Sequence, residues 1–179
     1  LSCIPGTIGG GLRMNSGCFK KEFKDILVSV QAVDRMGKVL TIPISKIKFS
    51  YRGNDLDKNL IFLSASFKGS LKKKEIAKQE TEILIKKKEK AQPTQVKTGG
   101  STFKNPITQT NKKVWELIKS SVPENTYFGD ATISKKHSNF FVNKNNAKFD
   151  DMKKLIDFVK EKVKEKTGIN LDLEIEIIG

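Results

Sequence analysis

The chain has 179 residues, of which 37% are hydrophobic, and it can therefore form one ordinary domain or two small ones. Its formal net charge of +14 comes almost entirely from lysine, because arginine occurs only as Arg13, Arg35 and Arg52. This scarcity argues against a nucleic-acid partner, since bidentate readout of bases relies on guanidinium groups. The charge is expected to form a solvated, lysine-rich surface with some attraction for anions.

No apolar run is long enough to cross a bilayer, and no secretory signal is visible. We therefore expect no membrane span and a reducing, cytoplasmic location in which Cys3 and Cys18 remain thiols. Leu1 is not a methionine, and residues 1–6 resemble the interior of a protein. The chain is expected to be a fragment of a longer protein.

The first segment with a distinctive pattern is glycine-rich and covers residues 4–11. Pro5-Gly6 suits a tight turn, and Asn15-Ser16-Gly17 interrupts the chain again. The segment does not show the dinucleotide-binding pattern of a strand followed by G-x-G-x-x-G. It forms either a cradle for phosphate or the close packing of a short helix against a sheet, and the residues alone favour the packing.

Strands are predicted for residues 26–33, 38–42 and 59–67. The first two are rich in β-forming residues and are separated by the turn residues 34–37, which is typical of a β-hairpin.

Between the second and third strands lies the pair Tyr51-Arg52. An arginine held beside a tyrosine at the edge of a sheet can bind a carboxylate or a phosphate in a fixed fork. The alternative is a surface arginine that stacks on Tyr51.

A helix is predicted for residues 72–91, with Ile76, Ile83 and Leu84 at helical spacing and a basic C-terminal end. Pro93 ends it, and residues 92–97 form a connector. We place the domain boundary between residues 91 and 92.

The loop at residues 98–106 combines backbone donors with polar side chains. Two glycines leave N–H groups open to an anion, and a hydroxyl, an ammonium and an amide follow. Such a turn brings a serine and several donors close to a negative group, whereas the alternative is a polar loop without chemistry. The residues concerned are Gly99, Gly100, Ser101, Lys104 and Asn105.

Two further helices are predicted after this loop. Residues 111–121 form the first, with Trp115 expected in the core. Asp150 is expected to cap the second, residues 151–166, and Gly168 to end it.

Residues 169–179 alternate strictly between apolar and polar side chains, which predicts a final strand. This strand either carries a glutamate into a cleft or is half buried with a charged outer face. His137, the single histidine, is a candidate acid, base or metal ligand, but no second histidine or cysteine cluster supports a metal. A hydrogen-bonded structural histidine is favoured.

Several short motifs occur in a specific order and spacing along the chain. They are I-P-G-T-I-G-G, M-N-S-G, Y-R, Q-P, G-S-T-F-K-N-P, K-H-S-N-F-F-V-N and L-E-I-E-I-I-G. Together they resemble the UDP-N-acetylenolpyruvoylglucosamine reductase family over residues 4–179. The resemblance implies an α+β fold in two parts: residues 1–91 as the C-terminal part of a flavin-binding domain, and residues 92–179 as a small α+β substrate domain.

The resemblance implies an NADPH- and FAD-dependent enzyme that reduces UDP-N-acetylglucosamine enolpyruvate to UDP-N-acetylmuramate for peptidoglycan synthesis. Ser101 matches the proton-donating serine of the family. Arg52 and Glu174 match the arginine and glutamate that polarise the substrate carboxyl group and stabilise the enolate.

Binding residues are also implied by the resemblance. Lys104 and Asn105 match positions near the UDP diphosphate, and Tyr51 is counted with the substrate-binding positions. The segment that matches a flavin-contacting region contains Pro5, Gly6, Thr7, Gly9, Gly10, Asn15 and Gly17.

The sequence departs from the family pattern in several places. The first flavin segment is absent, Phe19-Lys20 replaces Tyr-Gly, and residues 122–125 replace a glycine-containing turn. We expect the fragment to need the missing N-terminal portion of the same protein for activity. The alternatives are a lysine-rich module that binds nucleic acid or another polyanion, and a decayed gene product without function.

Overall fold

The computed structural model describes residues 4–178 and divides into two compact units, Leu1–Ile85 and Lys86–Gly179. Both units combine helices with antiparallel strands, so the expected α+β class is confirmed. The division lies near the boundary predicted at residue 91, while the flavin and substrate roles of the two parts stay predictions. Cys3 lies outside the described residues.

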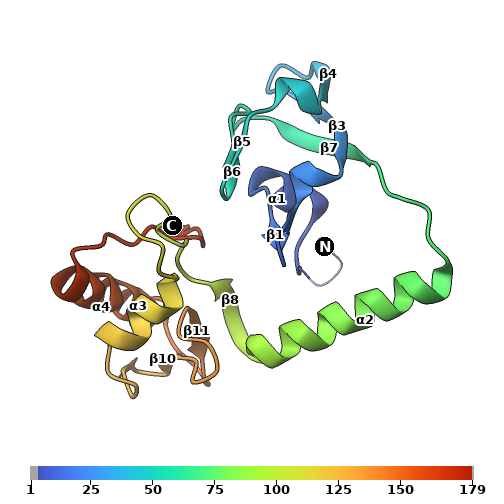
Figure 1. The fold of residues 1–179 in the computed structure, drawn as a ribbon. Helices are drawn as coiled ribbons and strands as arrows, with labels where there is room; N and C mark the ends of the chain where they lie inside the picture. The colour runs from blue at the N-terminus through green and yellow to red at the C-terminus, as the bar shows by residue number, and fades with distance from the viewer. Residues whose placement is uncertain (1–3, 179) are drawn as a thin grey trace. The chain divides into compact units, whose positions relative to one another are not determined.

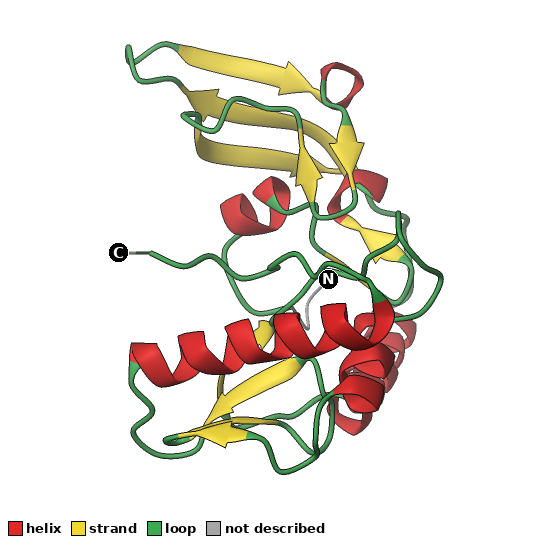
Figure 2. Ribbon diagram, turned by 90° about the vertical axis from the view of Figure 1, so that its left-hand side faces the viewer, coloured by secondary structure: helices red, strands yellow, loops and turns green. Residues whose placement is uncertain are grey.

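The first unit is built on a three-stranded antiparallel sheet (Figures 1 and 2). Its strands are β3 (Leu27–Val33), β4 (Val39–Pro43) and β7 (Ile61–Phe67), in the order β4-β3-β7. The predicted hairpin and third strand are thus confirmed. The Asp34 carboxylate closes the hairpin turn by accepting hydrogen bonds from two backbone N–H groups within it.

Shorter elements surround this sheet. They are α1 (Ile8–Arg13), β1 (Gly17–Cys18), β2 (Lys21–Glu22), β5 (Phe49–Ser50), β6 (Gly53–Asn54) and two 3₁₀ turns, η1 (Phe23–Asp25) and η2 (Ile44–Lys46). β1 pairs with β2, and β5 pairs with β6. The apolar core of the unit consists of Leu12, Phe23, Leu27, Val30 and Ile47.

Arg13 fixes α1 to the chain that precedes β7. Its guanidinium group donates to the carbonyl oxygens of Leu56, Asp57 and Leu60 at 3.0–3.2 Å. It also lies 4.7 Å from the centroid of the Phe62 ring. Arg13 therefore has a structural role.

Gly11 allows α1 to pack closely on η1. A Cβ atom at this position would lie 2.4 Å from Cζ of Phe23, whose side chain is buried. At Gly9, in contrast, a Cβ atom would be 3.7 Å from Phe62, an ordinary contact. The structure therefore supports the packing interpretation for Gly11.

The helix α2 (Lys74–Ala91) is continuous across the division between the units (Figure 1). It starts two residues after the predicted position and ends where predicted, before Pro93. No helix in residues 4–178 has both the length and the apolar character that crossing a bilayer requires.

The second unit contains a four-stranded antiparallel sheet and two helices (Figure 2). The sheet order is β8-β11-β10-β9, and α4 contacts α3, β9 and β10. The elements are β8 (Lys97–Ser101), α3 (Val114–Ser121), β9 (Tyr127–Phe128), β10 (Ala131–Ile133), β11 (Phe140–Asn143) and α4 (Phe149–Thr167). The core between them includes Phe103, Leu117, Ile118, Phe141, Leu155 and Val159.

The predicted start of α4 is wrong. The helix begins at Phe149, and its N-cap is Lys148 rather than Asp150. Asp151, at the third helical position, accepts a 2.9 Å hydrogen bond from the Lys148 backbone N–H, because a carboxylate there faces back toward the cap. The predicted end is confirmed, with Gly168 in the left-handed conformation at φ +72°.

Two other predictions about the second unit need correction. Trp115 is 41% exposed and does not belong to the buried core. Residues 169–178 form no regular strand, and a single bridge joins Leu173 to Phe103. Up to Leu173 the alternation describes which side chains are covered, because Ile169, Leu171 and Leu173 pack on the core while Asn170 and Asp172 are exposed. Beyond it the alternation fails, since Glu174 is half buried and Ile177 is 42% exposed.

His137 is held among aromatic rings in the second unit. Its ring centroid lies 4.9 Å from that of Phe140 and 6.4 Å from that of Trp115. Its Nδ1 accepts a 3.2 Å hydrogen bond from the Asn139 backbone N–H. Burial lowers the pKa of His137 from its ordinary value of 6.5. These contacts support a structural role for the neutral imidazole.

We predict that Gly11→Ala destabilises the protein by about 1–3 kcal/mol, because the new methyl group collides with the buried Phe23 ring. Gly9→Ala is the matched control and should be neutral or stabilise α1 by up to about 1 kcal/mol. Urea unfolding followed by circular dichroism measures both. Equal free energies of unfolding for the two variants would contradict the packing described for Gly11.

A second prediction concerns the pH dependence of stability. The pKa of His137 is lower in the folded than in the unfolded protein, so the unfolded state binds a proton first as the pH falls below about 6.5. His137→Gln should therefore lose less free energy of unfolding than wild type between pH 7 and pH 5. Urea titrations across this range measure the difference, and parallel curves for the two proteins would show that His137 is not buried as described.

Candidate functional site

The glycine-rich segment of the first unit lines a cavity of about 410 Å³. Thr7 caps α1 by accepting a 3.1 Å hydrogen bond from the Gly10 backbone N–H. Gly6 has φ +127°, and no atom lies within 4 Å of the place where its Cβ would be. Four of the predicted flavin-contacting residues line this cavity: Pro5, Gly6, Thr7 and Gly10.

Asn15 belongs to the framework behind the cavity. Its side chain is fully buried, and its Nδ2 donates to Oε2 of Glu22 at 2.9 Å and to the Ser50 carbonyl at 3.1 Å. Its Oδ1 accepts the Lys24 backbone N–H at 3.2 Å. Asn15 therefore ties three segments of the first unit together, and its expected contact with a flavin stays a prediction.

Of two other predicted flavin-contacting glycines, Gly17 has a packing role, while Gly9 has room for a side chain. A Cβ at Gly17 would lie 2.7 Å from Cγ of Glu22, so the β1–β2 hairpin has no room for a side chain there. Gly9 faces the ring of Phe62. Neither residue lines the cavity.

Arg52 lies in the turn between β5 and β6 with a left-handed backbone, φ +58°. Its guanidinium carbon lies 4.9 Å from the centroid of the Tyr51 ring, and one guanidinium nitrogen donates to the Gly17 carbonyl at 3.4 Å. The stacked arrangement is therefore present. The same contacts direct the guanidinium group toward the hairpin that follows the glycine-rich segment, and its role toward a substrate carboxyl stays a prediction.

Ser101 and Glu174 lie on adjacent segments of the second unit, although they are far apart in the sequence. Ser101 ends β8, after which the chain pairs with residues 172–174. The Glu174 backbone N–H donates to the Thr102 carbonyl at 2.9 Å, and the Lys104 N–H donates to the Asp172 carbonyl at 2.8 Å. The fold thus brings these two predicted catalytic residues together, while Arg52 belongs to the first unit.

Lys104 and Asn105 continue the same loop and are both half buried. Oδ1 of Asn105 accepts a 3.0 Å hydrogen bond from the Val114 backbone N–H at the start of α3. α3 begins at Val114 rather than at the predicted residue 111, with Lys113 as its N-cap. The loop therefore carries one predicted catalytic and two predicted binding residues on a well-supported backbone.

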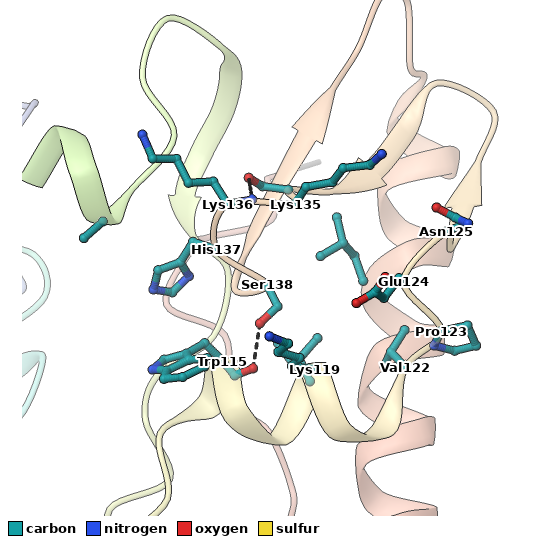
Figure 3. Close-up of a pocket in the computed structure, with 14 residues that line it drawn as sticks. Trp115, Lys119, Val122, Pro123, Glu124, Asn125, Lys135, Lys136, His137 and Ser138 are labelled. Atoms are coloured by element: carbon teal, nitrogen blue, oxygen red, sulfur yellow. Dashed lines mark hydrogen bonds between the residues drawn. The ribbon is translucent and has the colours of Figure 1, made fainter.

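A second cavity, of about 570 Å³, was not foreseen from the sequence (Figure 3). It lies between α3 and the chain around His137, and the Ser138 hydroxyl donates to the Trp115 carbonyl at 2.6 Å across it. Figure 3 shows the side chains of Lys135 and Lys136 extending away from Trp115. His137, a candidate acid or base in the sequence, lines this cavity, but none of the residues that the family resemblance implies for catalysis or binding does.

One wall of the second cavity is formed by Val122, Pro123, Glu124 and Asn125. These residues replace the glycine-containing turn of the family pattern. That replacement was the signal in the sequence that could have pointed to this cavity. Within residues 4–178, no three histidine, cysteine, aspartate or glutamate side chains are grouped so that they could hold a metal ion.

Known proteins are similar to this chain over both of its units. Residues 92–178 match the model of the UDP-N-acetylenolpyruvoylglucosamine reductase C-terminal domain. The UDP-N-acetylenolpyruvoylglucosamine reductase of Pelagibacter ubique is 67% identical over 99% of this chain and 59% of its own length. That of Rickettsia massiliae is 43% identical over 98% of this chain and 59% of its own length.

The fold has a counterpart among solved structures. The crystal structure of UDP-N-acetylenolpyruvylglucosamine reductase from Thermus caldophilus matches with a TM-score of 0.79 and 30% identity, over 97% of this chain and 60% of that protein. The chain thus spans about three fifths of the length of these relatives. The comparisons do not favour a polyanion-binding module. The resemblance found in the sequence is confirmed: residues 92–178 belong to the C-terminal domain of the UDP-N-acetylenolpyruvoylglucosamine reductase family, and nearly the whole chain is similar to these reductases.

Proposed function

We propose that this chain is part of a flavin-dependent enzyme that acts in the cytoplasm in peptidoglycan synthesis. With FAD as cofactor and NADPH as reductant, the enzyme reduces UDP-N-acetylglucosamine enolpyruvate to UDP-N-acetylmuramate. The single observation that carries the proposal is the backbone pairing that joins the Ser101 segment to the Glu174 segment in a chain related to these reductases.

The residues of the first unit are suited to hold part of the cofactor. The cavity beside α1 is within the range of small-molecule sites, and the absence of side chains at Gly6 and Gly10 allows close approach to the backbone. Bound FAD would supply the hydride that adds to one carbon of the enolpyruvyl double bond. Gly6, Thr7 and Gly10 are the residues that we assign to this contact.

Ser101 is assigned the proton that completes the reduction. Its hydroxyl group gives a proton to the second carbon of the former double bond, and solvent returns a proton to the serine. A serine hydroxyl is a weak acid, so the step requires that the enolate charge already be stabilised when the proton moves. Arg52 and Glu174 are assigned to the substrate carboxyl group, where the Arg52 guanidinium offsets the enolate charge and Glu174 contributes only by giving it a hydrogen bond.

Lys104 and Asn105 are assigned to the diphosphate of the substrate. An ammonium and an amide are suitable partners for phosphate oxygens. Both residues follow Ser101 in the same loop, so a diphosphate bound there would hold the sugar end of the substrate near the serine.

The proposal is tested in a full-length protein made by joining this chain to the part of the Pelagibacter ubique relative that it does not match. We predict substrate-dependent oxidation of NADPH, followed by its absorbance, and a flavin absorption spectrum. Ser101→Ala should lower turnover by about 10²- to 10⁴-fold, because a positioned proton donor is removed.

Ser120→Ala is the matched control, since Ser120 is an exposed serine on α3 whose hydroxyl group donates to the Leu117 carbonyl within its own helix turn. It should keep wild-type turnover. Unchanged turnover in Ser101→Ala would show that Ser101 is not the proton donor. A fusion protein that folds and binds FAD yet does not oxidise NADPH with this substrate would contradict the proposed function.

A further inference from the structure

Asn139 is a buried polar residue that the proposed mechanism does not use. It lies just before β11, and its side chain is 3% exposed. Its Oδ1 accepts the Phe103 backbone N–H at 3.0 Å, and its Nδ2 donates to the Phe103 carbonyl at 2.8 Å. Its own carbonyl accepts the Thr102 N–H at 2.8 Å. Three hydrogen bonds from one residue thus hold the two residues that follow Ser101.

These hydrogen bonds replace a strand partner that is missing at this point. β8 pairs with β11 as far as Ser101, opposite Phe140, and the register is irregular there. Beyond Ser101 the chain leaves the sheet, so the backbone of Phe103 has no neighbouring strand on the β11 side. The Asn139 amide offers one donor and one acceptor, as a strand residue does, and completes the pairing.

The opposite edge of the same backbone pairs with the Glu174 segment. In an extended chain, successive residues direct their N–H and C=O groups to opposite sides. Accordingly, the Phe103 groups face Asn139, while the Thr102 carbonyl accepts the Glu174 N–H at 2.9 Å. Residues 102–103 are therefore held between Asn139 and the residue assigned to enolate stabilisation.

An apolar side chain could not do the same. It could fill the volume, but it would leave the Phe103 N–H and C=O buried and without partners, at a cost for each group. The surroundings are apolar and fully packed, because Phe103 and Phe141 are almost completely buried beside Asn139. The chain would relieve that cost by moving, and Ser101 would move with it.

We propose that Asn139 is a positioning residue, whose side chain sets the place of the Ser101 hydroxyl group relative to Glu174. This inference rests on the proposed function of Ser101. Asn139 acts through the Phe103 backbone and does not itself contact the substrate. A displacement of the serine of about 1 Å is enough to cost roughly 10²-fold in rate.

The test replaces Asn139 by aspartate in the fusion protein. An ionised carboxylate accepts from the Phe103 N–H but repels its carbonyl, whereas the protonated acid again offers one donor and one acceptor. Lowering the pH converts the introduced carboxylate to this protonated form. Asn139→Asp should therefore lower kcat at neutral pH by about 10- to 100-fold with little change in KM, and kcat should recover toward wild type as the pH falls.

His137 accepts a hydrogen bond from the Asn139 backbone N–H, so the pH comparison is made in a His137→Gln background, which removes the titration of His137. Asn143→Asp is the matched control. Asn143 lies on β11 and bonds to both the N–H and the carbonyl of Ala147 through its amide, away from Ser101. It should keep the wild-type kcat.

Hydrogen exchange tests the role of Asn139 independently of enzyme activity. It therefore shows whether this inference fails or the proposed function fails. The Phe103 amide should exchange faster in Asn139→Leu, whose side chain offers it no acceptor, than in wild type, and it should be unchanged in Asn143→Asp, whether or not the protein turns over. Equal exchange in all three proteins would overturn the inference. So would a kcat loss in Asn139→Asp that does not reverse with pH, or that Asn143→Asp shares.

Discussion

The antiparallel bridge between Phe103 and Leu173 is the contact on which the candidate site of the second unit depends. Phe103 is fully buried, and Leu173 packs on the same apolar core. The hydrophobic effect therefore holds together two segments that are far apart in the sequence. Ser101 precedes one of these segments and Glu174 ends the other, so apolar packing places the polar residues to which we assign chemistry.

Several residues predicted for binding or catalysis also have structural roles. Asn15 joins three segments of the first unit, and Asn105 supports the start of α3. Arg52 bonds to the Gly17 carbonyl. Because buried amides are costly without partners, these contacts fix the backbone on which the site is built. A loss of activity in variants of these residues needs a stability measurement beside it.

The sequence predicts well those features that depend on neighbouring residues. The hairpin around Asp34 and the end of α4 at Gly168 follow from local turn chemistry and are present in the structure. The prediction of a final strand at residues 169–179 was wrong. Alternation of apolar and polar side chains can indicate which side chains are covered, but it does not show whether a neighbouring strand is present for pairing. The role of Asn139 has no local signal at all, since it arises from contact with Phe103.

The bridge itself can be observed directly by nuclear magnetic resonance on the purified chain. Phe103 and Leu173 form a non-hydrogen-bonded antiparallel pair, the type in which the two Cα atoms approach most closely. The account predicts a strong nuclear Overhauser effect between the two Hα protons. Its absence in a folded protein would mean that Glu174 is not held beside the Ser101 loop, and the site described for the second unit would be contradicted.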